Sequence, residues 1–234
     1  MLRALFHSAM AATPGRCEVC HAWPARTVCD ACVEQFAQPV PRCGRCAHPV
    51  FPGVAQCGGC VRQPPLLSAC HAAVSYGFPW SGLITRYKFL GQPGWADSFA
   101  SLMRSAPWIE PTLDGADLVL PMPLAPGRLA GRGFNQALEL ARRLAPGRTQ
   151  AALLLRVRET APQTALDRAG RRANVMKAFA LDPLRASEVQ GRAVVLVDDV
   201  MTSGASLYSA AQELLRAGAS KVSGVVLARA GEMA

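Results

Sequence analysis

The sequence contains no long hydrophobic run, although hydrophobic residues make up 50% of its 234 positions. No segment approaches the ~18 consecutive apolar residues that a membrane-spanning helix requires. The first twelve residues, MLRALFHSAMAA, are interrupted by His7 and Ser8, so their apolar run is too short for a secretion signal. We therefore expect a soluble, cytoplasmic protein with no membrane span.

Lysine, acidic residues and aromatic residues are also scarce. Aromatics make up 6% of the chain, and 16 acidic residues stand against 25 basic ones, of which 22 are arginine. The large hydrophobic share argues against a wholly disordered chain. The length is enough for one α/β core with a small additional module, but not for two full-sized domains.

The arginines are concentrated in one part of the chain. The segment from Arg128 to Arg172 holds ten arginines and three acidic residues. Guanidinium groups suit phosphates, whether these belong to a small ligand or to a nucleic acid. The formal net charge of +9 is a weaker indication of DNA binding, because eight thiolates holding two zinc ions would lower it to about +5.

Cysteine provides the clearest pattern in the composition. Eight of the nine cysteines form four C-x-x-C pairs in the first sixty residues: Cys17/Cys20, Cys29/Cys32, Cys43/Cys46 and Cys57/Cys60. One such pair grips an ion from a tight turn, and a tetrahedral zinc site needs two pairs. The spacing predicts two structural zinc sites in a double zinc ribbon. We favour pairing in sequence order, and an interleaved arrangement remains an alternative.

Other uses of these cysteines are weighed against zinc. An even cysteine count also suits disulfides, but no export signal accompanies it. The run Cys17-Glu-Val-Cys20-His21 matches an attachment motif for c-type haem, which would leave three pairs unexplained. Cys70 stands apart and is expected to be a core residue or a free thiol. A site closed by four thiolates has no open position for a substrate, so the ribbon is interpreted as structural or partner-binding.

The rest of the chain has the pattern of an α/β domain. Helices are expected at 80–103, broken around 91–94, and at 135–144 and 205–216, while 107–115 is expected to be a loop and 158–176 polar and mobile. Strands are expected at 69–78, 118–120, 151–155, 193–197 and 222–228. The last two strands with the helix between them form a parallel crossover.

The loop inside this crossover carries the candidate chemistry. Asp198 and Asp199 follow the strand, and Thr202-Ser203-Gly204-Ala205-Ser206 leads into the helix. Ligands of parallel sheets bind at the carboxyl ends of the strands. Each carboxylate can accept a hydrogen bond from one of two vicinal ribose hydroxyls. The loop amides, the hydroxyls and the helix N-terminus suit a phosphate. An ordinary helix cap would need only one such residue.

The run VVLVDDVMTSGAS resembles the phosphoribosyl-pyrophosphate signature of type I phosphoribosyltransferases. Three further stretches resemble the competence protein ComF family: PMPLAPGRLAGRGFNQALELA, RVRETAPQTALDRAGRRANVMKAF and YGFPWSGLITRYKFLG. The resemblance implies a double zinc ribbon over 1–65 and a phosphoribosyltransferase-like domain over 66–234. That domain would contain a five-stranded parallel core and a small hood at about 69–115.

The resemblance also implies a set of site residues. Asp198 and Asp199 are the candidate catalytic residues, and a turn at 122–126 would meet the pyrophosphate. The candidate ligand-binding residues are Val200, Met201, Thr202, Ser203, Gly204, Ala205, Ser206, Pro123, Leu124, Arg128, Arg132, Arg158 and Arg171. Mg²⁺ would accompany the ligand.

Several functions are consistent with these residues. An active enzyme would displace pyrophosphate from C1 of the ribose with a nitrogen acceptor. The family name also implies a part in DNA uptake, with partners that include DNA-uptake proteins. The alternatives are therefore a non-catalytic adaptor that handles single-stranded DNA and a ligand-sensing regulator on the same fold.

Overall fold

The computed structural model describes residues 15–89, 92, 94–158 and 178–231. The chain divides into two compact units, Met1–Gln38 and Pro39–Ala234. The first unit contains α2 (Asp30–Phe36) and the first two C-x-x-C pairs. The second unit contains the other two pairs together with the sheet, so the second cysteine cluster and the sheet belong to one compact body.

The centre of the second unit is a parallel sheet of four strands. Their order across the sheet is β1 (Ala69–Ser75), β6 (Lys221–Arg229), β5 (Ala193–Met201) and β2 (Leu118–Pro121). The strands β5 and β6 are almost completely buried, as their continuous apolar sequences predict for a parallel sheet covered on both faces.

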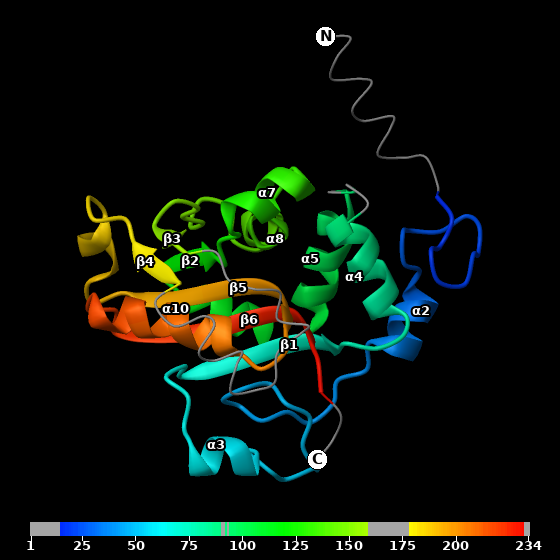
Figure 1. Cartoon of the computed structure of the whole chain (residues 1–234). Coiled ribbons are helices and arrows are strands. Elements are labelled where there is room, and N and C mark those ends of the chain that lie inside the picture. The colour runs from blue at the N-terminus through cyan, green and yellow to red at the C-terminus, as the bar shows by residue number, and fades with distance from the viewer. Residues whose placement is uncertain (1–14, 90–91, 93, 159–177, 232–234) are drawn as a thin grey trace. The chain divides into compact units, whose positions relative to one another are not determined.

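Helices cover the two faces of this sheet (Figure 1). On one face, Val194 and Leu196 of β5 share a buried cluster with Leu207 and Leu214 of α10 (Ala205–Arg216). On the other, α8 (Gln136–Leu144) packs against β5 and β2 and against α5 (Trp95–Ser105). The smaller elements are α3 (Gly58–Arg62), α4 (Trp80–Phe89), α6 (Ile109–Asp114), α7 (Pro126–Arg132), η2 (Ala186–Val189) and the antiparallel pair β3 (Leu154–Arg156) and β4 (Phe179–Leu181).

The predicted α/β class and the crossover are confirmed. The strand β5 pairs in parallel with β6, and α10 spans the predicted residues 205–216 between them. The expected helix at 135–144 begins one residue later, because the side chain of Asn135 caps it by accepting hydrogen bonds from the backbone N–H groups of Ala137 and Leu138. The helical spacing of a few apolar residues, together with a capping residue, is therefore sufficient to locate this helix.

Two sequence expectations are wrong in detail. Residues 109–114 form α6 rather than a loop. Pro111 stands in its first turn, where a missing N–H costs nothing, and Ile109 and Leu113 bury one face. The parallel sheet has four strands among the described residues instead of the expected five. The strand expected at 151–155 is β3, which pairs antiparallel with β4, and only one parallel bridge, between Val119 and Thr149, forms beside β2.

Among the described residues, no helix has both the length and the apolar character that are needed to cross a membrane.

Candidate functional site

The two acidic residues lie within β5 and not after it. Asp198 is in register with Val226 and Val200 with Ala228, so the β5–β6 ladder continues to Met201. The expectation that the strand ends at 197 is therefore wrong. The acids take part in a rigid parallel ladder, which positions both carboxylates more firmly than a loop would.

A lysine from a distant helix meets the second acid. The Nζ atom of Lys88, in α4, lies 2.9 Å from Oδ1 of Asp199, and both side chains are largely buried. The backbone N–H of Asp199 also donates to Oδ1 of Asp198, at 2.9 Å. Sequence reasoning missed Lys88, because no local pattern connects α4 with the end of β5.

The first acid titrates near neutral pH. Burial raises the pKa of Asp198 to about 7, and the neighbouring carboxylate of Asp199 contributes to the increase. Lys88 and Arg156 act in the opposite direction. A cationic or hydrogen-bonding ligand would favour the ionised form of Asp198, so ligand binding at this place is expected to release a proton.

The loop after β5 places a glycine at the start of α10. Gly204 precedes α10 with φ of 79°, a left-handed conformation that suits glycine. A Cβ atom there would lie 2.4 Å from Cε of Met201 and 2.7 Å from Cζ of Tyr208. Ser203 Oγ accepts a weak hydrogen bond from the N–H of Ala205, at 3.4 Å. The first N–H groups of a helix have no partner within the helix, and the positive end of its dipole favours a phosphate.

The turn predicted to meet pyrophosphate lies beside the acids. The N–H of Met122 donates to the carbonyl oxygen of Val197, at 2.9 Å, and Asn135 Nδ2 donates to the Met122 carbonyl. The first bond attaches the start of the turn to β5 one residue before Asp198, and the second attaches it to the N-cap of α8. Pro123 and Leu124, both partly buried, continue the turn.

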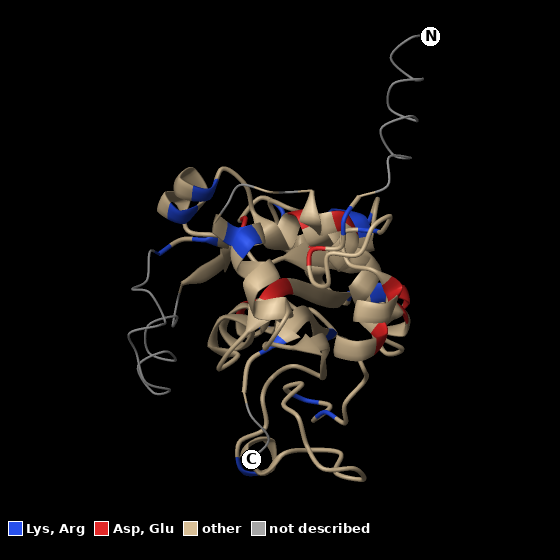
Figure 2. Ribbon diagram, turned by 90° about the vertical axis from the view of Figure 1, so that its right-hand side faces the viewer, with Lys and Arg blue, Asp and Glu red and all other residues tan. Residues whose placement is uncertain are grey.

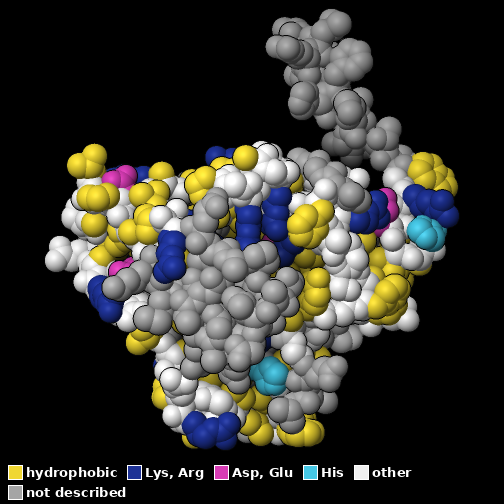
Figure 3. All heavy atoms as spheres, in the orientation of Figure 1, with side chains coloured by type: hydrophobic (Ala, Val, Ile, Leu, Met, Phe, Trp, Pro, Cys, Tyr) yellow, Lys and Arg dark blue, Asp and Glu magenta, His cyan; other side chains and the backbone are white. Residues whose placement is uncertain are grey.

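Arginines surround the same place. Cζ of Arg132 lies 4.8 Å from the centre of the Phe89 ring, and its Nη1 donates to Gln136. Burial lowers the pKa of Arg132, while the carboxylates of Asp199 and Asp198 act to raise it, so they are within electrostatic reach. In Figure 3, which has the orientation of Figure 1, Lys and Arg side chains lie next to one another in the upper middle of the molecule, below α7.

The other predicted arginines have different outcomes. Arg128 adds positive charge near Arg132. The side chain of Arg158 is exposed, and its carbonyl accepts a hydrogen bond from Nε of Arg156. Arg171 lies outside the described residues. Acidic and basic residues otherwise occur together on the helices around the sheet (Figure 2), so the local excess of cations near Asp198 and Asp199 is more informative than the net charge.

The eight cysteines of the four pairs form two groups in sequence order. Within each group the four Sγ atoms lie within 4.8 Å of one another: Cys17, Cys20, Cys29 and Cys32 in the first cluster, and Cys43, Cys46, Cys57 and Cys60 in the second cluster. The preferred sequential pairing is thus the one that the structure adopts. Both groups could hold a zinc ion.

The distances between sulfur atoms fit zinc rather than disulfides. The Sγ atoms of Cys17 and Cys32 are 3.8 Å apart, and those of Cys46 and Cys57 are 3.7 Å apart. A tetrahedron with Zn–S bonds of about 2.3 Å has edges of about 3.8 Å, whereas a disulfide bond is about 2.05 Å long. Burial raises the pKa of the Cys46 thiol to about 11, whereas at Cys43 backbone N–H donors outweigh burial and lower the pKa to about 7.

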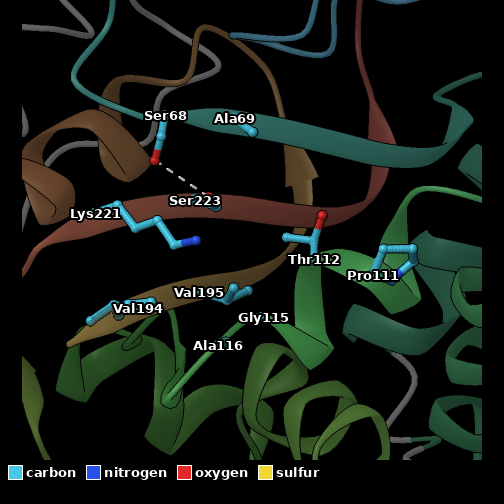
Figure 4. Close-up of a pocket in the computed structure, with 11 residues that line it drawn as sticks. Ser68, Ala69, Pro111, Thr112, Gly115, Ala116, Val194, Val195, Lys221 and Ser223 are labelled. Carbon is cyan, nitrogen blue, oxygen red and sulfur yellow. Dashed lines mark hydrogen bonds between the residues drawn. The ribbon is translucent and has the colours of Figure 1, made fainter.

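A cavity of about 250 Å³ lies at the other end of the strands (Figure 4). Residues at the amino ends of β1, β5 and β6 line it, including Ser68, Ala193 and Lys221. No acidic residue lines it among those that the structure describes. We therefore place the candidate ligand site at the carboxyl end of β5.

The sequence is similar to a domain family and to several known proteins. The phosphoribosyl transferase domain family matches residues 129–233. The DNA utilization protein YhgH of Salmonella typhimurium is 33% identical over 226 residues, which cover 91% of this chain and 96% of that protein. Competence protein F of Haemophilus influenzae is 32% identical over 213 residues, covering 87% of this chain and 90% of that protein.

A solved structure of the allosteric regulatory enzyme of purine biosynthesis is more distant. It is 17% identical, has a TM-score of 0.39, and the match covers 61% of this chain and 29% of that one. This similarity is too low to support an argument about function.

Proposed function

Because the chain belongs to the family of the DNA utilization protein YhgH and competence protein F, we propose that it binds phosphoribosyl pyrophosphate or a related ribose phosphate and uses this site in the handling of DNA. One observation carries the proposal. Two carboxylates at the end of a central parallel strand are followed directly by a glycine-containing loop at the N-terminus of a helix of twelve residues.

The two parts of the site suit the two parts of the ligand. Asp198 and Asp199 accept hydrogen bonds from the two ribose hydroxyls, and the loop from Thr202 to Ser206 surrounds the phosphate. Lys88, Arg132 and Arg156 supply positive charge that complements the pyrophosphate. Because Asp199 forms an ion pair with Lys88, the ribose hydroxyl would share this carboxylate with the lysine.

Mg²⁺ is proposed to bind together with the ligand. Asp198 and Asp199 would hold the ion at this site together with the ligand, because carboxylate oxygens are the hard donors that Mg²⁺ prefers. The ion would neutralise charge on the pyrophosphate and make it a better leaving group. The proposed reaction class, if the bound ligand turns over, is displacement of pyrophosphate from the ribose by a nitrogen acceptor.

Zinc at the two cysteine clusters is proposed to be structural. Each cluster offers four thiols and no open coordination position, so neither would bind a substrate. The proposed place of action is the cytoplasm, where reducing conditions keep such thiols available for metal.

Calorimetry with phosphoribosyl pyrophosphate and Mg²⁺ tests the ligand. We expect the wild type to bind, and the double variant Asp198→Asn, Asp199→Asn to lose at least about a hundredfold in affinity, because each position loses a charged hydrogen-bond acceptor. Asp114→Asn is the matched control, since this exposed carboxylate lies in α6 and is 3.9 Å from Arg148, far from the acids in sequence and in element. A folded wild type that shows no binding would reject the proposal.

Handling of single-stranded DNA is the second candidate function, and the name of the DNA utilization protein YhgH favours a role that involves DNA. The same variants distinguish it from the first. We would measure binding of a fluorescent single-stranded oligonucleotide at about 50 mM and about 200 mM salt. A steep loss of affinity with salt, equal in the wild type and the double variant, would indicate a phosphate-binding surface separate from Asp198 and Asp199.

A further inference from the structure

A buried arginine connects the second cysteine cluster with the phosphate loop. Arg229, the last residue of β6, is 8% exposed. Its Nε donates to the carbonyl oxygen of Cys46, at 2.9 Å, and its Nη1 donates to the carbonyl oxygen of Met201, at 3.2 Å, and to that of Ala230. One guanidinium group therefore joins a turn of the cluster to the residue that immediately precedes Thr202.

Packing provides a second connection between the same parts. The backbone N–H of Cys70, in β1, donates to the carbonyl oxygen of Gly44 between two cluster ligands, at 2.9 Å. The Sγ of Cys70 lies 3.5 Å from Sδ of Met201. Met201 and Tyr208 in turn leave no room for a side chain at Gly204. Displacement of the cluster would thus be transmitted to the residues that shape the phosphate loop.

The charges around Arg229 point to a metal-loaded cluster. Arg42 immediately precedes the cluster ligand Cys43, and its Nη1 donates to the carbonyl oxygen of Ala47, at 3.1 Å. The described partners of these two guanidinium groups are carbonyl oxygens and the Ser75 hydroxyl rather than carboxylates. Nε of Arg42 is buried without a hydrogen-bond partner in the part of the chain that the structure describes. A Zn²⁺ ion with four thiolates carries a charge of about −2, which balances two arginines.

We infer that Arg229 is a positioning residue through which the metal-loaded second cluster holds the phosphate loop in its binding conformation. The consequence for ligand affinity rests on the proposed ribose-phosphate site, but the connection between cluster and loop does not. Loss of metal from the second cluster should loosen residues 201–208 even when no ligand is added.

Hydrogen exchange of the full-length, zinc-loaded chain tests this connection directly. We would compare the wild type with Arg229→Met and Arg229→Lys, measuring exchange of residues 201–208, zinc content and thermal unfolding. In Arg229→Met we expect exchange of this segment to be at least about tenfold faster, since Met201 loses a charged hydrogen bond. Arg229→Lys keeps the positive charge but replaces the guanidinium, which donates from two nitrogens, with a single ammonium group. We therefore expect its increase in exchange to be intermediate.

Arg148→Met is the matched control. Arg148 also donates to two carbonyl oxygens, those of Leu113 and Ala116, but it lies beside β2, the edge strand that is separated from β6 by β5. This variant should unfold at a lower temperature without faster exchange at 201–208. A Cys57→Ser variant, which removes one ligand of the second cluster, should reproduce the effect of Arg229→Met on this segment.

The outcomes separate the inference from the proposed function. Unchanged exchange at 201–208 in folded Arg229→Lys and in Cys57→Ser would overturn the inference, whatever the ligand. Faster exchange in these variants, with a wild type that nevertheless binds no phosphoribosyl pyrophosphate, would reject the proposed function and leave the connection standing. If the wild type binds, faster exchange should be accompanied by about tenfold weaker binding in Arg229→Met.

Discussion

The two cysteine clusters have the same ligands but different surroundings. In the first unit, the buried residues among those described are Cys17 and Cys32 themselves. In the second unit, Cys43, Cys46 and Cys60 belong to one buried cluster with Met201, Ala205 and the inward face of α10. The first cluster holds the buried residues described in its own unit, whereas the second belongs to the buried core of the unit that carries the candidate site. One motif thus has two different structural consequences.

Removal of one ligand from each cluster should give the largest contrast. We expect Cys20→Ser to unfold the first unit, which has no other core among its described residues, and to leave the unfolding temperature of the second unit unchanged. Cys46→Ser should destabilise the second unit by more than ~3 kcal/mol, because it disrupts a metal site continuous with the sheet. Thermal unfolding would measure the stability, and NMR spectra of the backbone amides would show which unit has unfolded.

Equal destabilisation of the second unit by the two substitutions would contradict this contrast. Zinc analysis is the necessary control, because each variant should lose one of the two ions and keep the other. A Cys70→Ser substitution provides a further comparison, since this buried cysteine belongs to neither metal-ligand group.

The phosphate loop offers a test of intermediate size. Gly204→Ala should destabilise the second unit by about 1–3 kcal/mol, because φ is positive there and the new methyl group would collide with Met201 and Tyr208. Gly147→Ala is the control: φ is 82° and no atom lies within 4 Å of the added Cβ, so only a backbone cost of about 1 kcal/mol is expected. Urea unfolding would measure both, and an equal cost would show that the contacts of the loop contribute nothing.

The pH dependence of ligand binding should give the smallest effect. The pKa of Asp198 is raised to about 7, so the free site holds a proton at about pH 6 that the bound ligand and Mg²⁺ displace. Affinity should therefore rise about tenfold between about pH 6 and about pH 8. The ligand titrates as well, so calorimetry on Asp198→Asn supplies the background slope. The pH dependence of affinity that is lost in Asp198→Asn should have the same size when both proteins also carry Cys20→Ser. The reason is that the first cluster belongs to the other unit.

The same raised pKa has a consequence for stability. The folded state retains a proton on Asp198 at pH values where an aspartate in the unfolded chain, whose pKa is ordinarily 3.8, has lost it. The free energy of unfolding should thus decrease as the pH rises from about 4 to about 7, insofar as Asp198 contributes. Asp198→Asn should remove this contribution, and a stability profile that is unchanged by the substitution would contradict the assigned pKa.

Local sequence patterns were sufficient to predict a large part of the candidate site and of the metal clusters. The spacing of two residues within each cysteine pair and the order of the pairs predicted both clusters, because neighbouring turns can meet without help from the rest of the chain. The run from Val194 to Ser206 predicted the strand, loop and helix, since parallel strands are continuously apolar and a helix start favours glycine and hydroxyl residues nearby.

Other features were decided only by the tertiary structure. Lys88 meets Asp199 because α4 folds over the end of β5, and Arg229 meets Cys46, 183 positions away, because β6 ends beside the second cluster. No periodicity or spacing connects such residues, since their proximity depends on how several elements pack. The sequence by itself determined which chemical groups are present and the local loops that hold them. Packing decided which charges face the acids and which of two identical metal motifs supports the sheet.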